Sequence, residues 1–164
     1  VCVTIGVSSD RVPVSPNWTT IAAVRRAVDV PLVVKGVMSP DVARIALDQG
    51  AEGLVVSDHG EPRVGPKALP IDVLPAVSET VNGRVPVIVD GSFRRGTDLL
   101  KALALGATAV MVARPAMWGL AAYGTEGVQV VLELLQTELA RNMAASGRPR
   151  IDMIDRELVR FDSR

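Results

Sequence analysis

The chain has 164 residues, with 18 basic and 18 acidic side chains and only 3% aromatic residues. This length predicts one domain over residues 1–164, shorter than the roughly 200 residues or more of a complete (β/α)₈ barrel. The balanced charge and the scarcity of aromatic residues argue against a nucleic-acid partner, and every apolar run is too short to cross a membrane. We therefore expect a soluble, cytoplasmic protein without a signal peptide, bound to neither nucleic acid nor membrane.

Apolar runs alternate with amphipathic segments along the chain. We expect strands at residues 1–5, 31–37, 53–57, 85–89 and 109–112. Helical spacing predicts helices at 18–28, 40–49, 71–81, 98–105 and 115–123, a long helix capped by Thr125, and a last turn at 151–158. Because the strands are apolar throughout, they are typical of a parallel sheet covered on both faces. The pattern predicts an α/β fold with about five parallel strands.

Three residues carry further local expectations. Cys2 is the only cysteine, so it forms no internal disulfide, has no metal-ligand spacing around it and is expected in the core. No metal site is expected. Ser39 precedes a proline and marks a helix start, and Thr97 offers an N-cap hydroxyl to the helix at 98–105.

Residues 85–115 organise the chain, because they read as strand, basic turn, helix, strand and second basic turn. Arg94 and Arg95 lie in the first turn and Arg114 lies in the second. In α/β folds, ligands bind between the end of a strand and the start of the next helix, since free N–H groups at helix N-termini attract anions there. The pattern is equally typical of solvated loop charges, so it leaves both interpretations open.

Two polar residues interrupt the apolar strands. Lys35 lies inside the run at 31–37, and His59 follows the run at 53–57. A lysine in a buried strand is costly unless it meets an anion or a wet site, which favours a functional role. A lone histidine at a strand end is more often structural. If the strands belong to a barrel, these two residues and the basic turns meet at the end where barrel enzymes place their chemistry.

These segments resemble the FMN-dependent 2-hydroxy-acid oxidases and dehydrogenases, such as glycolate oxidase, lactate oxidase and mandelate dehydrogenase. The matching segments are 31–37 (PLVVKGV), 56–60 (VSDHG), 89–98 (VDGSFRRGTD), 101–107 (KALALGA), 114–115 (RP) and 118–124 (WGLAAYG). Their order and spacing fit without gaps over residues 18–161. The resemblance covers the later part of the family's barrel and implies a partial TIM barrel, with the first three strands absent.

The resemblance implies FMN as cofactor and oxidation of a small 2-hydroxy acid to the 2-oxo acid by hydride transfer to the flavin. It places these residues at the cofactor: Thr4, Lys35, Ser57, Asp90, Gly91, Arg94, Ala113 and Arg114. Lys35 would stabilise negative charge on the reduced flavin ring, while the residues from Asp90 onward would bind the ribityl phosphate end. His59 would take the proton of the substrate hydroxyl.

Departures from the family pattern cluster on the substrate side. The family arginine that grips the substrate carboxylate is Pro62 here, and Arg63 is the neighbouring candidate for that role. The family aspartate that pairs with the histidine is Gly6, and the asparagine before the histidine is Asp58.

On the phosphate side, two family glycines are Ser92 and Ala113, whose side chains would crowd a phosphate. The insertion after the first strand is reduced to residues 7–16.

Two alternatives stay open beside the FMN enzyme. One is a catalytically inactive half-barrel that acts as a binding or assembly module. The other is an IMP-dehydrogenase-like phosphate-binding barrel, which needs a loop cysteine that this chain lacks. Five parallel strands cannot close a barrel. We therefore expect an N-terminal barrel fragment or a second copy of the chain to cover the open sheet, or the sequence to be one piece of a longer protein.

Overall fold

The computed structural model describes residues 1–6, 16–60 and 68–160. Pro62, Arg63 and most of the loop expected at 7–16 therefore lie outside the described residues. The described elements are β1 (Cys2–Thr4), α1 (Trp18–Ala27), β2 (Val33–Lys35), α2 (Pro40–Asp48), β3 (Gly53–Val56), α3 (Pro70–Val81), β4 (Val87–Val89), α4 (Gly96–Ala104), β5 (Ala109–Val110), α5 (Arg114–Ala145), and the 3₁₀ turns η1 (Ile151–Met153) and η2 (Arg156–Leu158).

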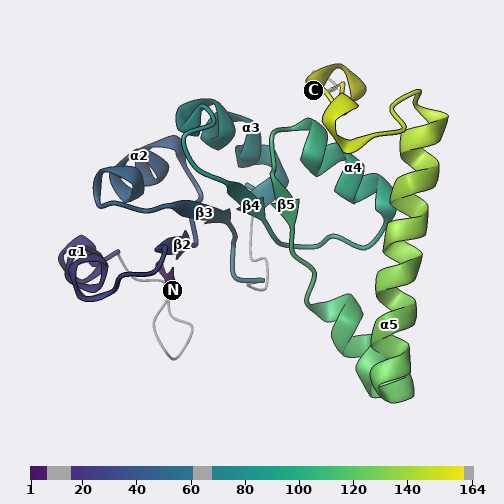
Figure 1. The fold of residues 1–164 in the computed structure, drawn as a ribbon, viewed down its shortest axis with the longest axis horizontal. Coiled ribbons are helices and arrows are strands. Elements are labelled where there is room, and N and C mark those ends of the chain that lie inside the picture. The colour runs from purple at the N-terminus through teal and green to yellow at the C-terminus, as the bar shows by residue number, and fades with distance from the viewer. Residues whose placement is uncertain (7–15, 61–67, 161–164) are drawn as a thin grey trace.

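The strands form one parallel sheet in the order β1-β2-β3-β4-β5. Each strand is followed by a helix, as the alternation in the sequence predicts, and the order is that of consecutive strands in a barrel wall. Figure 1 shows the strands as a row, with α2, α3 and α4 along one side of it and α5 at the β5 end. The partial α/β barrel expected from the sequence is confirmed.

The hydrophobic core lies between the sheet and these helices. Val34, Leu54, Val56 and Val89 point from the strands to this outer side, and each is completely buried. They pack in one cluster with Leu74 of α3 and other helix residues. Side chains alternate along a strand, so the residues between them point to the opposite, inner face of the sheet.

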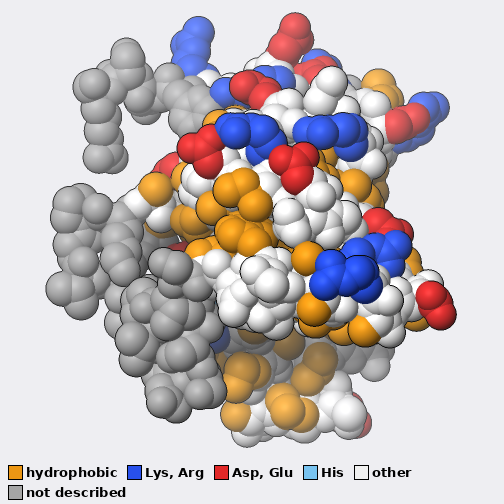
Figure 2. All heavy atoms as spheres, turned by 90° about the vertical axis from the view of Figure 1, so that its left-hand side faces the viewer, with side chains coloured by type: hydrophobic (Ala, Val, Ile, Leu, Met, Phe, Trp, Pro, Cys, Tyr) orange, Lys and Arg blue, Asp and Glu red, His pale blue; other side chains and the backbone are white. Residues whose placement is uncertain are grey.

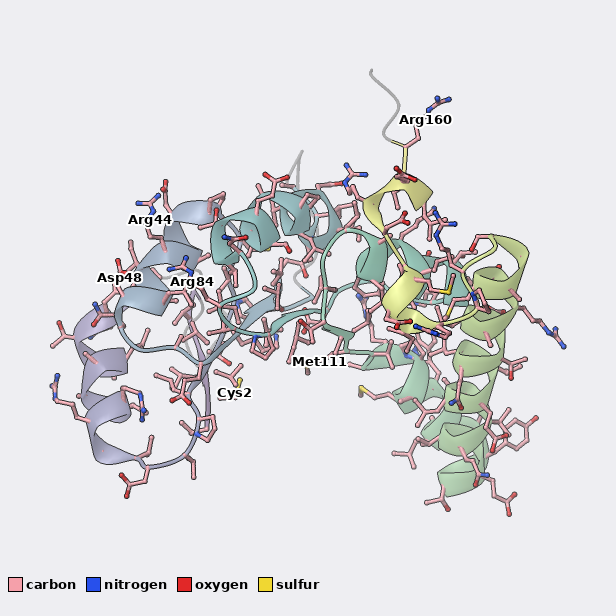
Figure 3. All side chains as sticks on the ribbon, turned by 45° about the horizontal axis from the view of Figure 1, so that its top comes forward. Cys2, Arg44, Asp48, Arg84, Met111 and Arg160 are labelled. Carbon is pink, nitrogen blue, oxygen red and sulfur yellow. The ribbon has the colours of Figure 1, made fainter. Side chains whose placement is uncertain are left out.

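The inner face is open at both ends of the sheet. The register aligns Cys2 with Val33 and Thr4 with Lys35 on this face, and Ile88 with Ala109. Cys2 is exposed, so the expectation of a core cysteine is wrong, and the first strand is largely unburied. Figure 3 shows Cys2 and Met111 on the side of the sheet away from α2 and α3.

The physical reason is that β1 is an edge strand of the described sheet and pairs only with β2. Hydrophobic side chains also reach the surface at the β1 end, where Val1 and Val30 are about half exposed. Figure 2, which looks at the α1 and α2 end, shows hydrophobic groups among charged ones.

Helix caps follow the sequence at α2 but not at α4. The Ser39 hydroxyl accepts the Val42 N–H at 3.2 Å, as predicted. Helix α4 begins at Gly96, so Thr97 lies inside its first turn and the predicted Thr97 cap is wrong. Instead the Asp98 carboxylate accepts the N–H groups of Arg94 and Arg95, both at 2.9 Å. A carboxylate accepts two N–H groups at once, which a single hydroxyl does less strongly.

Helix α5 consists of two helical segments joined by a kink at Tyr123 and Gly124, where the backbone leaves helical geometry. This break matches the two helices predicted at 115–123 and after Thr125. A Cβ on Gly119 would lie 2.4 Å from the Gly127 carbonyl oxygen, so the two segments touch through their backbones. No described helix is long and apolar enough to cross a membrane.

Candidate functional site

The carboxyl ends of the parallel strands meet at one edge of the sheet, and a cavity of about 500 Å³ opens there. Its volume lies within the range of small-molecule sites. The lining residues come from the end of β2 and from the segments after β3, β4 and β5: Lys35, His59, Gly60, Asp90, Gly91, Ser92, Phe93, Arg94, Met111, Val112, Ala113, Arg114 and Met117. Apart from Thr4 and Ser57, every predicted site residue that the structure describes therefore lines this one hollow.

Lys35 is held by two neighbouring strand ends. Its Nζ lies 3.0 Å from Asp90 Oδ2 and donates a 2.8 Å hydrogen bond to the Ser57 hydroxyl. Ser57 is completely buried and also accepts the His59 N–H at 3.1 Å. The anion expected beside Lys35 is thus a carboxylate of the chain itself. Ser57 thus links Lys35 to the His59 backbone.

The two carboxylate oxygens of Asp90 differ in their hydrogen bonding. Oδ2 pairs with Lys35, whereas Oδ1 is buried and has no hydrogen-bond partner among the described residues. A buried acceptor without a donor costs about 1–3 kcal/mol. Oδ1 can therefore accept a hydrogen bond from a molecule that enters the cavity.

The His59 ring contacts the main chain just after β1 and β2. Its Nε2 lies 2.9 Å from the Ile5 carbonyl oxygen. A carbonyl only accepts, so this hydrogen bond requires the proton on Nε2 and leaves Nδ1 of the neutral ring as its acceptor. Gly36 makes room for the ring, because a Cβ there would lie 2.8 Å from Nε2. At Gly6, a Cβ would lie 3.8 Å from the same atom.

The three arginines of the basic turns point to different surroundings. Arg94 and Arg114 both line the cavity. The Arg94 guanidinium lies over the Trp118 ring, 4.9 Å from its centroid, and donates to the Phe93 carbonyl at 2.9 Å. Arg95 turns away and pairs with Glu138 of α5 at 2.9 Å. This pairing lowers the pKa of the Glu138 carboxyl and raises the pKa of Arg95.

The turn between β4 and α4 has two successive residues with left-handed backbone geometry. Gly91 has φ of +106° and Ser92 has φ of +65°. A Cβ on Gly91 would lie 3.0 Å from Pro70 and 3.3 Å from the Asp58 carboxylate, so the glycine is required for space as well as geometry. Ser92 takes the same region with a side chain, which costs about 1 kcal/mol or more.

The remaining predicted residues do not line the cavity. Thr4 is exposed on the inner face of β1, aligned with Lys35. Ser57 is completely buried and hydrogen-bonded to Lys35, and Arg63 is outside the described residues. Sequence reasoning missed Met111, Met117 and Phe93, which give the cavity an apolar side. For Met111, strand alternation carried the necessary information, because it lies two residues after Ala109 and so shares the inner face.

The described residues contain no cluster of three or more potential metal ligands. Comparisons with known proteins bear on the ligand that the cavity would take. Residues 6–161 match the family model described as FMN-dependent dehydrogenase. The chain is 48% identical over 146 residues to 2-hydroxyacid oxidase 1 of Mus musculus, covering 89% of this chain and 40% of the relative. It is 42% identical over 139 residues to L-lactate oxidase of a Nostoc species, covering 85% of this chain and 38% of the relative.

Solved structures of related oxidases are also similar to this chain. A mandelate oxidase structure with (S)-2-phenylpropionate superposes with a TM-score of 0.81 at 42% identity, covering 87% of this chain and 42% of that chain. A mandelate oxidase variant with the monooxide FMN adduct gives a TM-score of 0.81 at 40% identity, covering 93% of this chain and 48% of that chain. The chain spans about 40% of the length of the curated relatives it matches. It belongs to the FMN-dependent dehydrogenase family.

Proposed function

We propose that the chain supplies the FMN-binding and proton-accepting part of an enzyme that oxidises a small 2-hydroxy acid to the 2-oxo acid. The observation that carries the proposal is the convergence of Lys35, His59, Asp90, Arg94 and Arg114 on one cavity at the carboxyl edge of the sheet. A flavin phosphate requires cations, and the hydroxyl groups of the flavin side chain require an acceptor such as a carboxylate. The proton of an alcohol requires a base such as an imidazole.

The cavity residues fit FMN by their chemistry. Arg94 and Arg114 bring two positive charges to one side and would hold the phosphate, with the backbone at Ala113 and Gly91 beside them. The unpartnered Asp90 Oδ1 would accept a ribityl hydroxyl. Lys35 would lie by the flavin ring, where its charge offsets developing negative charge, and Thr4 and Ser57 would complete that side. When bound, FMN accepts the hydride.

His59 would take the substrate hydroxyl proton. The Ile5 carbonyl occupies Nε2, so the proton would arrive at Nδ1. The hydrogen bond to Ile5 and the space at Gly36 hold the ring in one orientation before substrate arrives, which general-base catalysis rewards. Arg63 is our candidate for the substrate carboxylate, since a guanidinium binds a carboxylate bidentately.

We propose that further barrel strands cover the inner face. Cys2, Ala109 and Met111 expose their side chains there, and β1 and β5 each pair on one side only within the described sheet. Unpaired strand edges and an apolar face are unstable in water. The complement would be the part of the family barrel that this chain does not span, on the same or a separate polypeptide.

A non-catalytic half-barrel is the second candidate. Gly6 favours it, because this position has no side chain to hold the imidazolium that a proton transfer to His59 would create. In that case the cavity would bind FMN, and no 2-hydroxy acid would reduce it.

The test is an absorbance scan of the chain purified with whatever protein copurifies. A flavin spectrum is expected, and lactate, glycolate or mandelate should bleach it when air is excluded. His59→Ala should keep the colour and lose the bleaching. A colourless wild-type protein that takes up no added FMN contradicts the proposed function. Colour that no 2-hydroxy acid bleaches favours the half-barrel, and bleaching that survives His59→Ala excludes His59 as the base.

A further inference from the structure

Two neighbouring arginines in one turn are treated in opposite ways. Arg95 meets the Glu138 carboxylate in a bidentate contact, which neutralises its charge. Within the described part of the chain, the Arg94 guanidinium has no carboxylate partner and lies on the Trp118 ring instead. An aromatic face attracts a cation without cancelling its charge. Arg94 is therefore held in place while keeping its full charge for an anion.

Trp118 lies on the helix that follows the second basic turn. It lies four residues after Arg114 on α5, so the two side chains emerge from the same face of the helix. The stacking contact thus joins the turn after β4, which carries Arg94, to the helix after β5, which carries Arg114. Both arginines line the same cavity, whereas Trp118 does not.

The exposure of Trp118 is otherwise unexplained. The residue is 56% exposed, and it is not part of the hydrophobic core cluster. The first segment of its helix is nonetheless closely packed, because the neighbouring Gly119 contacts Gly127 of the second segment with no room for a Cβ on either residue. A large indole on a fixed helix is a suitable platform for a guanidinium.

We propose that Trp118 is a positioning residue that sets the Arg94 guanidinium beside Arg114 so that both can grip one phosphate group. The inference rests on the proposed function, which supplies the phosphate as that of FMN. Trp118 itself touches no ligand. Its effect should therefore depend on the phosphate and vanish with a ligand that lacks one.

The test compares FMN with riboflavin, which lacks the phosphate, by fluorescence titration of the chain with its copurifying partner. A cation–aromatic contact at an exposed site is worth about 0.5–1 kcal/mol, so Trp118→Leu should weaken FMN binding about two- to fivefold. Riboflavin affinity should not change. Trp118→Phe keeps an aromatic face and should restore most of the FMN affinity. Tyr123→Leu is the matched control, because Tyr123 is a more exposed aromatic residue of the same helix.

A second readout needs no flavin. Stacking on an indole shifts the NMR signal of the Arg94 Nε–H by the ring current, and this shift should disappear in Trp118→Leu and persist in Tyr123→Leu. If the wild-type protein binds no FMN, the proposed function fails, and titration of the same signal with inorganic phosphate still tests the positioning role. Equal affinity of wild type and Trp118→Leu for FMN, or an unchanged Arg94 signal, overturns the inference.

Discussion

His59 illustrates how single residues at this site depend on main-chain partners. Its ring nitrogen is tied to the carbonyl of Ile5, 54 residues earlier, and its backbone N–H is tied to Ser57. The same Ser57 hydroxyl accepts from Lys35, so His59 and Lys35 are both hydrogen-bonded to one buried side chain. Gly36 completes the surroundings of the His59 ring, because φ of +108° and the absence of a side chain both let the backbone come close to the imidazole.

Gly36→Ala should therefore damage both stability and His59. The new Cβ would lie 2.3 Å from the Ile5 oxygen and 2.8 Å from His59 Nε2. Overpacking together with backbone strain predicts a loss of about 2–4 kcal/mol in the free energy of unfolding, measured by urea denaturation. Gly83→Ala is the control, since Gly83 also has positive φ but a Cβ there would meet nothing within 4 Å. Equal losses of unfolding free energy in the two variants would mean that backbone strain alone, and not contact with the His59 ring, accounts for the loss in Gly36→Ala.

At the scale of elements, α4 and α5 are joined by charged and backbone contacts in addition to the buried apolar side chains of α5, such as Leu135 and Met143. Glu138 accepts the Gly96 N–H at 2.8 Å while it binds Arg95, so one carboxylate of α5 both caps α4 and pairs with its N-cap residue. Gly96 lets the helices approach to backbone contact. This joint fixes the turn that presents Arg94 to the cavity.

Gly96→Ala tests the joint, and the expected sign is unusual. Alanine normally favours a helix over glycine by up to about 1 kcal/mol. Here its Cβ would lie 2.3 Å from the Leu139 nitrogen, so we expect a net loss of about 1–3 kcal/mol in thermal or urea unfolding.

Thr97→Ala is the companion variant, one residue along the same helix turn. Because Asp98 and not Thr97 caps the helix, its effect should stay within about 0.5 kcal/mol. A loss of about 1 kcal/mol or more would restore Thr97 as a cap. A stabilising Gly96→Ala would show that the two helices can separate without cost.

At the scale of the whole molecule, helices cover the outer face of the sheet, whereas the inner face leaves side chains exposed at both ends of the sheet. The outer face carries completely buried side chains beneath the helices, and the inner face exposes Cys2, Thr4 and Ala109. The cavity lies at the rim of the inner face. Covering that face would therefore both stabilise the sheet and enclose the site, which would exclude water from the proposed hydride transfer.

Cys2 reports on this directly, because it is the only thiol in the chain. In the chain without its complement, we expect a maleimide to modify Cys2 about as fast as in the urea-unfolded chain. When the complementary barrel strands are present, the reaction should slow strongly. A variant with Cys2→Ser and Val3→Cys moves the thiol to the helix-covered face and should be slower in the isolated chain. Rapid labelling of Cys2 in the complete assembly would contradict the proposed cover.

Short-range physics made much of this structure readable in the sequence. Apolar runs predicted the strands, helical spacing predicted the helices, and the parallel arrangement brought Lys35, His59, Arg94 and Arg114 to one edge. Each of these features depends on residues a few positions apart or on the common direction of parallel strands.

Only the tertiary structure decided what each polar residue meets. Arg94 and Arg95 are adjacent and identical in type, yet one rests on Trp118 and the other on Glu138, because α5 returns to α4 from more than twenty residues away. Likewise, the apolar run at Cys2 does not reveal that one face lacks a cover, and Thr97 does not reveal that Asp98 caps the helix. Pairings between distant segments depend on how helices and strands pack, and local sequence patterns carry no direct record of that packing.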